Sequence, residues 1–374
     1  MSKNVRITIW VLVVIIVVGV ICTLSNTSKE NGVIKIGSPL SLTGNNAVYG
    51  QPTQRGMDLA VDEINKNGKK VEIIYEDEKS TTEGVVSSFQ KLITIDKVPV
   101  TVGFMSSGGV LAAASIANES KVVLLSSLAG SDDIKNAGDY VFRIRESAST
   151  HGIEMAKYAK NVLGINKVAI YYANAANSIS YIDYFRNEFT SLGGTFVFEG
   201  KYVEKSSDFR SDLTKIKNTK PDAIYLAGVA ADMANILVQG KGLGIDAKWL
   251  ASAGAESPKL VDVAKSAAEG LIFTTPSFNP DQKESRVESF VSAYKQKYGE
   301  TPSFAAANGY DAVMLVYDVI KKNGYDSEKI KKGLYATKDY PGVGGTFSFD
   351  EFGEVQKPVM FKVVKNGQFV VLEK

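Results

Sequence analysis

The fold of this chain is decided by the stretch Val98-Pro-Val-Thr-Val-Gly-Phe-Met-Ser-Ser-Gly-Gly-Val110. It is a short apolar run, rich in β-branched residues, that ends in hydroxyl groups and glycine, and an alanine-rich run continues from it to Asn118. This pattern predicts a strand, a turn and the start of a helix. The next stretch, Val122-Val-Leu-Leu-Ser-Ser-Leu-Ala-Gly-Ser131, predicts a second strand that also ends in hydroxyl groups.

Ser106 and Ser107 lie in the turn that follows the first strand. In a parallel α/β sheet such turns gather at the carboxyl ends of the strands, where free backbone N–H groups at a helix N-terminus can hold an anion. A serine in this place also serves as an ordinary helix N-cap. Because a second hydroxyl-ended strand follows at once, we favour a ligand pocket flanked by Ser106 and Ser107.

Length and charge narrow the classes of function. A chain of 374 residues is too long for one ordinary core, which predicts two domains. Lys and Arg number 43 against 41 Asp and Glu, and the two excess cations are Lys3 and Arg6. The rest of the chain is therefore neutral, which gives no reason to expect a nucleic acid as a partner.

The N-terminus differs in kind from the rest of the chain. Residues 7–24 are uncharged and mostly apolar, and they follow the two cations. Such a run is typical of a membrane helix or of a signal peptide. The positive flank places the remainder of the chain on the extracytoplasmic side.

Cys22 is the single cysteine, which excludes an intrachain disulfide. Its place at the end of the apolar run resembles a lipid-attachment site of a bacterial lipoprotein, although bulky Ile21 stands where such sites have a small residue. Two alternatives stay open: an uncleaved helical anchor over residues 7–24, or a lipid on Cys22. In both, residues 1–32 form an anchor or signal helix and a polar leash.

Strands and helices alternate through most of the body. The alternation predicts parallel sheets covered on both faces, and it starts again near Ser149, which predicts two doubly wound lobes. Near the end, helices over Arg286–Tyr298 and Ala305–Asn323 follow each other without a strand. We therefore expect the chain to return to a lobe already built. Asn366-Gly367 predicts a closing hairpin.

Several motifs carry a resemblance to a known family over nearly the whole body. They are similar to motifs of the extracytoplasmic solute-binding proteins of branched-chain amino acid ABC importers. These motifs are Val33-Ile-Lys-Ile-Gly-Ser-Pro-Leu-Ser-Leu-Thr-Gly44, Gln54-Arg-Gly-Met-Asp-Leu-Ala-Val-Asp-Glu-Ile-Asn65, Ser207-Asp-Phe-Arg210, Pro221-Asp-Ala-Ile-Tyr225, Ala268-Glu-Gly270 and Gly344-Gly-Thr-Phe-Ser-Phe-Asp350. Their order and spacing together are more specific than any one of them.

The resemblance implies an architecture and a function. It implies two Rossmann-like lobes joined by three crossovers, which close on a ligand as a hinged trap. Lobe 1 would hold residues 33–148 and 277–340, and lobe 2 would hold residues 149–276 and 341–374. Proteins of this family bind an amino acid between the lobes and deliver it to an ABC permease in the membrane.

The resemblance also implies site residues in lobe 1. The turn that contains Ser106 and Ser107 would bind the carboxylate of the ligand, and Tyr49 matches a tyrosine in the first loop. The second turn would offer a backbone carbonyl and a hydroxyl to the ammonium group of the ligand. Its matching residues are Leu128, Ala129, Gly130 and Ser131.

Here the sequence departs from the family. The hydroxyl position of the second turn falls on Gly130, with Ser131 one step away. In lobe 2, a family tyrosine falls on Asn177 and the acid that pairs with the ammonium falls on Ala253. Val229 stands where the family often has an aromatic residue, which predicts a smaller pocket wall.

These departures bear on the ligand. Burying a ligand ammonium without a carboxylate partner costs on the order of several kcal/mol of binding free energy. An anion, in contrast, can be bound by serine hydroxyls and helix N–H groups alone. We therefore expect a ligand with a carboxylate or an amide and without an α-amino group. The alternative is that Glu256 or Asp232 supplies the missing charge.

Enzyme chemistry has little support in the sequence. His151 is the only histidine, and its place predicts helix capping and hinge packing rather than a triad. No Cys/His cluster predicts a metal site, and no phosphate-binding loop predicts a nucleotide, so we expect no cofactor. The sequence predicts a membrane-tethered binding protein that is not an enzyme. The alternatives are a chemotaxis or signalling sensor with the same fold and, more remotely, a secreted α/β enzyme.

Overall fold

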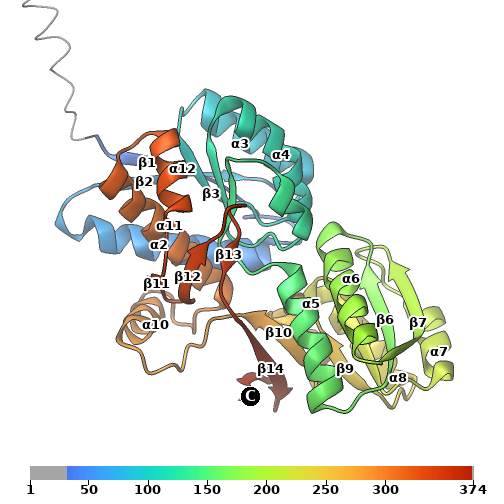
Figure 1. The fold of residues 1–374 in the computed structure, drawn as a ribbon. Coiled ribbons are helices and arrows are strands. Elements are labelled where there is room, and N and C mark those ends of the chain that lie inside the picture. The colour runs from blue at the N-terminus through green and yellow to red at the C-terminus, as the bar shows by residue number, and fades with distance from the viewer. Residues whose placement is uncertain (1–31, 373–374) are drawn as a thin grey trace, which may run out of the picture.

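Two sheets organise the structure, one in each of two lobes (Figure 1). The computed structural model describes residues 32–372. In lobe 1, parallel strands follow the order β2-β1-β3-β4-β5, which confirms the doubly wound pattern. The direction of strand addition reverses between β1 and β3, where ligands of such sheets bind. The strands are β1 (Ile34–Leu40), β2 (Val71–Asp77), β3 (Val100–Gly103), β4 (Val123–Ser126) and β5 (Val141–Arg143).

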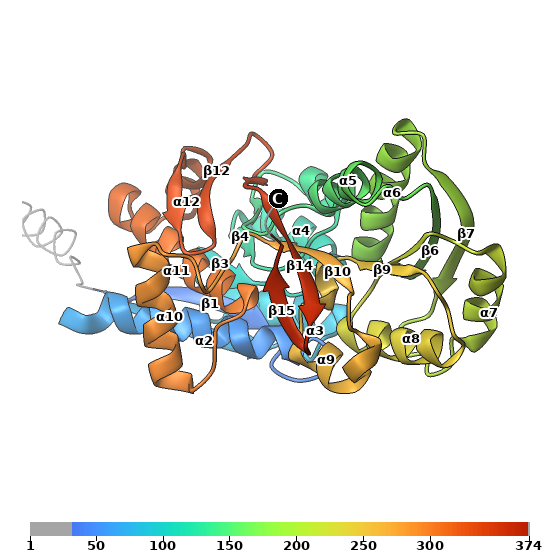
Figure 2. The same ribbon diagram turned by 90° about the horizontal axis from the view of Figure 1, so that it is seen from below.

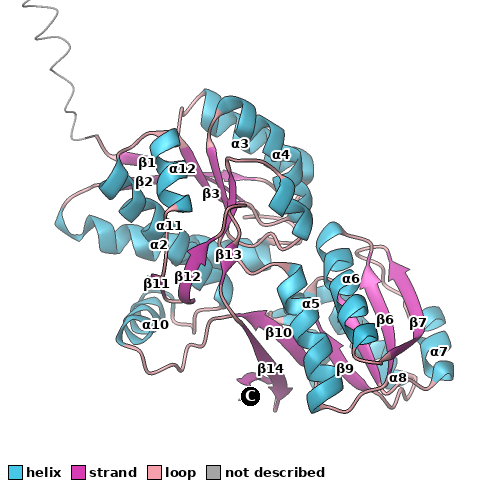
Figure 3. Ribbon diagram, in the orientation of Figure 1, coloured by secondary structure: helices cyan, strands magenta, loops and turns pink. Residues whose placement is uncertain are grey.

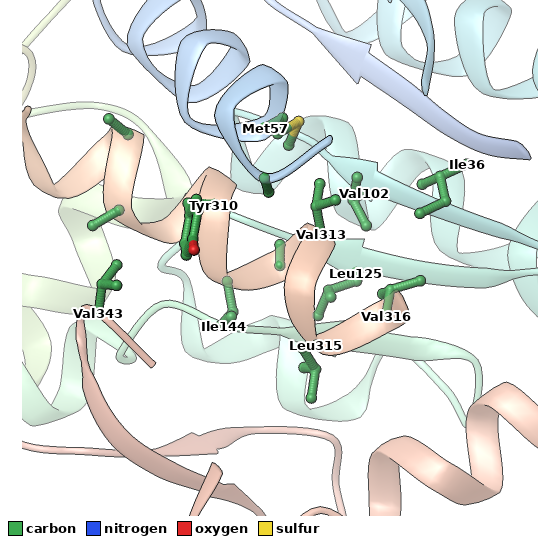
Figure 4. Packing of buried hydrophobic residues seen from close by; sticks show 14 of the residues in the cluster. Ile36, Met57, Val102, Leu125, Ile144, Tyr310, Val313, Leu315, Val316 and Val343 are labelled. Carbon is green, nitrogen blue, oxygen red and sulfur yellow. The ribbon is translucent and has the colours of Figure 1, made fainter. Parts of the chain in front are cut away.

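Helices cover both faces of this sheet (Figure 3). Successive side chains of a strand point to opposite faces, so Leu125 packs in one core with α2 and α11 while Leu124 packs in another with α3 and α4. Figure 4 shows the first core, in which Met57 of α2 and Val313 of α11 lie near Val102 of β3. The helices of lobe 1 are α2 (Ala47–Ile64), α3 (Thr82–Thr94), α4 (Ser107–Ser120), α10 (Ser285–Tyr298), α11 (Phe304–Asn323) and α12 (Ser327–Tyr335).

Lobe 2 has a mixed sheet of order β15-β14-β10-β9-β8-β6-β7. Only β14 and β15 run antiparallel to their neighbours in it. Asn366 and Gly367, which join them, both have positive φ (53° and 70°), as a tight hairpin turn requires, so the predicted hairpin is confirmed. The strands are β6 (Lys167–Ala173), β7 (Thr195–Tyr202), β8 (Ala223–Ala227), β9 (Lys248–Ala251), β10 (Ile272–Pro276), β14 (Val359–Lys365) and β15 (Gln368–Val371).

Helices also flank the sheet of lobe 2, with α5 and α6 on one face and α7, α8 and α9 on the other. Phe185 of α6 packs on Tyr225 of β8 with their ring centroids 4.3 Å apart. The helices are α5 (Ala148–Lys157), α6 (Ala176–Ser191), α7 (Arg210–Thr219), α8 (Ala230–Gly242) and α9 (Pro258–Ala264). One-turn segments are η1 (Asn65–Asn67), η2 (Asp132–Asn136), η3 (Tyr158–Val162), η4 (Ala253–Ala255) and η5 (Lys265–Ala267).

A small third sheet divides the C-terminal segment differently from the sequence-based expectation, which assigned residues 341–374 to lobe 2. Its strands are β11 (Tyr340–Gly342), β12 (Gly345–Phe349) and β13 (Val355–Gln356). Phe347 and Phe349 belong to the core of lobe 1, where Phe349 packs on Phe142 at 5.7 Å between ring centroids. Only β14 and β15 join lobe 2, so the change of lobe lies between β13 and β14.

The chain passes between the lobes three times, after β5, after β10 and after β13 (Figure 2). Glu146 on the first crossing accepts a hydrogen bond from the backbone N–H of Ser277 on the second (3.1 Å). The same carboxylate lies 3.7 Å from the ammonium of Lys357 on the third, and both side chains are buried. One carboxylate therefore ties all three crossings together.

The predicted anchor over residues 7–24 and the predicted lipid site at Cys22 lie outside the described residues. Within residues 32–372, none of the helices combines the length and the apolar character that a membrane span needs.

Candidate functional site

A cavity of about 400 Å³ lies between the two lobes. Its wall is built from the carboxyl ends of parallel strands and from the N-termini of α2, α3, α4, α6 and α8. The structure brings nine of the sequence-predicted residues to this cavity. From lobe 1 come Tyr49, Ser106, Ser107, Leu128, Ala129 and Gly130. From lobe 2 come Asn177, Val229 and Ala253.

Ser107 ties the two hydroxyl-ended turns of lobe 1 together. Its Oγ accepts hydrogen bonds from the backbone N–H groups of Gly130 (3.1 Å) and Ser131 (3.0 Å). A hydroxyl has two acceptor lone pairs and one donor, so only the O–H of Ser107 is left for a further partner. Ser106 caps α4, because its Oγ accepts from the N–H of Gly109 (3.2 Å). The first N–H groups of α4 have no partner within the helix, so this wall offers donors to a ligand.

Arg145 lies in the same wall and is buried, with 6% of its surface exposed. Its Nη1 donates to the backbone carbonyl of Leu128 (2.6 Å), and its Nη2 donates to the hydroxyl of Tyr181 on α6. Two nearby buried acids have other cationic partners: Glu146 pairs with Lys357, and Glu354 pairs with Arg143. Within the described part of the chain, no carboxylate forms an ion pair with Arg145.

The lobe 2 wall is built differently. Helices α6 and α8 begin after Ala175 and Val229, whose side chains cannot cap a helix, and both helix starts line the cavity. Asn177 reaches across to lobe 1, where its Oδ1 is 2.4 Å from the position that a Cβ on Gly130 would occupy. That oxygen is buried and has no hydrogen-bond partner among residues 32–372.

Tyr49 joins the two walls directly. Its hydroxyl donates to the backbone carbonyl of Gly254 in η4, with 2.8 Å between the oxygens. Burial raises the pKa of Tyr49 to about 12, so the hydroxyl keeps its proton at neutral pH. The bond crosses from lobe 1 to lobe 2, so the lobes are closed on the cavity.

Three residues named in the sequence analysis do not line this cavity: Ser131, Glu256 and Asp232. Ser131 lies behind Gly130 and its Oγ is 3.1 Å from the Oγ of Ser180 on α6. Glu256 is buried against Lys362, with 2.6 Å between Oε1 and Nζ, and it also accepts a hydrogen bond from Thr275. Asp232 accepts from the N–H of Lys205 and lines a smaller neighbouring cavity of about 220 Å³.

Comparison with known proteins agrees with this two-lobed architecture. The sequence profile described as periplasmic binding protein matches residues 33–368. The chain belongs to this family.

Three solved structures of binding proteins are similar to it over nearly the whole described chain. The first is a leucine binding protein from Thermotoga maritima, with a TM-score of 0.87 and 31% identity. The match covers 91% of this chain and 98% of the Thermotoga chain. A branched-chain amino acid transporter substrate binding protein from Streptococcus pneumoniae, solved with isoleucine, gives 0.85 at 32% identity, covering 91% and 99%. A solute binding protein of an ABC transporter from Rhodopseudomonas palustris, solved with 3,4-dihydroxybenzoic acid, gives 0.82 at 27% identity, covering 92% and 97%.

Sequence reasoning missed three charged residues of this periplasmic binding protein that line the cavity: Arg145, Glu204 and Lys205. Glu204 and Lys205 are adjacent and exposed at its edge, whereas Arg145 is buried. A signal for Arg145 was present, because it lies two residues after β5, which pairs with the hydroxyl-ended strand β4.

Among the described residues, His151 has no hydrogen-bond partner that would suit acid–base chemistry. It is fully buried in α5, neither ring nitrogen has a hydrogen-bond partner among the described residues, and burial lowers its pKa well below the usual value. The N-cap of α5 is Ser147, so the expected capping role of His151 is wrong. Within residues 32–372, no group of three or more His, Cys, Asp or Glu residues could hold a metal ion.

Proposed function

We propose that this periplasmic binding protein captures a branched-chain amino acid or a related small carboxylate or amide outside the cell membrane and delivers it to the permease of an ABC importer. The observation that carries the proposal is the cavity between the lobes, which is lined from both sides and closed by the bond from Tyr49 to Gly254. Tethering by residues 7–24 or by Cys22 is part of the proposal.

The two walls suggest an order of events. A carboxylate or amide oxygen binds first to lobe 1, where the hydroxyl of Ser107 and the N-terminus of α4 are held ready by the bonds to Gly130 and Ser131. Rotation about the three crossings then brings Tyr49 to Gly254 and encloses the ligand. The permease would recognise this closed form.

The size of the cavity and the ligands of similar proteins support this class of ligand. A volume of about 400 Å³ is within the range of small-molecule pockets. Isoleucine and 3,4-dihydroxybenzoic acid, which occupy two of the similar structures, both carry a carboxylate.

A thermal-shift screen of the purified chain tests the binding function. The panel holds leucine, isoleucine and valine, their deaminated acids, the matching amides and benzoate. A ligand that binds the native state raises the melting temperature in proportion to the logarithm of its concentration. If none of these compounds raises it at millimolar concentration, the proposed ligand class is wrong.

A transport assay separates delivery from sensing. Deletion of the gene in its own host should abolish uptake of the radiolabelled ligand found in the screen, and the tagged protein should co-purify with a permease. Unchanged uptake together with a lost chemotactic response to that ligand would instead identify a sensor.

A further inference from the structure

The guanidinium of Arg145 occupies one lone pair of the carbonyl that a ligand ammonium would use, and it places a positive charge beside that position. The resemblance to amino acid-binding proteins assigns a backbone carbonyl of the second turn to the ammonium. In this chain the carbonyl of Leu128, which lines the cavity, accepts a hydrogen bond from Nη1 of Arg145 at 2.6 Å.

Gly130 makes room for this arrangement. A Cβ at this position would lie 3.0 Å from Nη1 of Arg145 and 2.4 Å from Oδ1 of Asn177. A threonine or serine, which the family has here, would crowd both side chains. The absence of a side chain at Gly130 therefore leaves the space that Arg145 and Asn177 occupy.

The charges around the cavity also favour a negatively charged ligand. A guanidinium has five N–H donors. Two nitrogens of Arg145 have acceptors, while its buried Nε has none among residues 32–372. Among the described residues that line the cavity, Glu204 is the only acid, and it is exposed beside Lys205. In the closed form Arg145 is therefore a buried cation without a counter-ion among residues 32–372, which is costly unless the ligand supplies the negative charge.

We propose that Arg145 determines the ligand specificity of this site. Its guanidinium supplies the positive charge that the α-ammonium group of an amino acid would otherwise bring, and it pairs with a ligand that carries a net negative charge. This inference rests on the proposed function and narrows it. The ligand is a carboxylic acid without an α-amino group. The hydroxyl of Ser107 and the N-terminus of α4 bind its carboxylate, and Arg145 balances its charge.

The test uses ligands that share one carbon skeleton. Leucine, 4-methylpentanoate and 4-methylpentanamide differ only at the polar end, and phenylalanine and 3-phenylpropanoate form a second pair. Calorimetry on the purified full chain should show each acid binding at least about thirtyfold more tightly than its amino acid, as expected when a buried charge gains its partner. The amide should fall between them.

Three variants separate the charge of Arg145 from its structural contacts. Arg145→Met should weaken binding of the preferred acid by about thirtyfold and remove most of its advantage over the amino acid. Arg145→Lys keeps a cation and should keep part of that advantage, which guards against misfolding of the methionine variant. Tyr181→Phe removes the bond from Nη2 but not the charge, so the ratio of acid to amino acid affinity should not change.

Each outcome decides between the inference and the broader function. If leucine or phenylalanine binds as tightly as its deaminated acid, Arg145 does not select against an ammonium, but the solute-binding function stands. The same holds if Arg145→Met folds and keeps the wild-type ratio. If no acid, amide or amino acid of the set binds, both the inference and the proposed function are overturned.

Discussion

Arg145 in lobe 1 and Glu256 in lobe 2 are both buried charged residues beside the same cleft, yet the structure uses them in opposite ways. Glu256 is 8% exposed and has its counter-ion, Lys362, outside the cavity. Arg145 lines the cavity and has no carboxylate partner among residues 32–372. A buried ion that is already paired has its charge balanced within its own lobe, whereas an unpaired one is available to a ligand.

The neutral hydrogen-bonding groups of the two walls also differ in how firmly they are held. Lobe 1 holds its donors rigid, because Ser107 accepts from both Gly130 and Ser131. Lobe 2 offers the uncapped starts of α6 and α8, after Ala175 and Val229. We infer that lobe 1 recognises the ligand and that lobe 2 mainly encloses it.

The largest effect is expected from filling the gap in front of the lobe 1 wall. Gly108 lines the cavity, and a Cβ there would meet nothing closer than Thr82 Oγ1 at 3.8 Å. Gly108→Trp should therefore fold but place an indole between the lobes and remove measurable ligand binding in calorimetry. The matched control is Gly242→Trp, at the far end of α8, where a Cβ has no neighbour within 4 Å. Wild-type affinity in Gly108→Trp would place the ligand elsewhere.

Glu256→Gln is expected to lower the stability of the protein strongly and to leave its ligand affinity unchanged. The change leaves the ammonium of Lys362 buried without a carboxylate, which should cost about 3 kcal/mol of unfolding free energy. Urea denaturation measures this loss, and adding Lys362→Met should recover part of it. Ligand affinity of the folded fraction should stay within about twofold of wild type, because Glu256 is not among the residues that line the cavity. A loss of ligand affinity as large as the loss of stability would show that Glu256 reaches the ligand.

Much of the fold could be predicted because its signals are local. The runs of β-branched residues before each turn and the Asn366-Gly367 hairpin depend only on neighbours in sequence. The lobe that receives β12 was not predictable in this way. Alternation in Thr346–Phe349 indicates a strand with one buried face, but only tertiary packing on Phe142 shows which core that face enters.

The residues of the candidate site were likewise predictable only where their signals are local. Ser107 and Gly130 were found because they follow predicted strands. Arg145 was missed because the state of a charge depends on partners far away in sequence. Arg143, two positions earlier, pairs with Glu354, 211 positions distant, whereas Arg145 has no such acid in the described part of the chain. Nothing local distinguishes the two arginines in Phe142-Arg-Ile-Arg-Glu146.

The smallest effect is expected at the bond that joins the walls. Tyr49→Phe removes the hydrogen bond to Gly254, which is worth about 1 kcal/mol to the closed form, so ligand affinity should fall about fivefold. The matched control is Tyr325→Phe, because Tyr325 makes the same kind of bond to the carbonyl of Lys35 within lobe 1 (2.7 Å). That variant should bind ligand as the wild type does.

The pH dependence of the same bond gives a second measurement. The pKa of Tyr49 is raised from 10.0 to about 12 by burial, so the folded, closed form favours the protonated hydroxyl. Its contribution is fully present below pH 10 and is lost as the pH rises from 10 to about 12. Calorimetry across this range should show wild-type affinity declining towards that of Tyr49→Phe, whose own profile lacks the decline. If the two profiles run parallel, the bond to Gly254 does not hold the lobes closed, and lobe 2 must contact the ligand more strongly than its uncapped helices suggest.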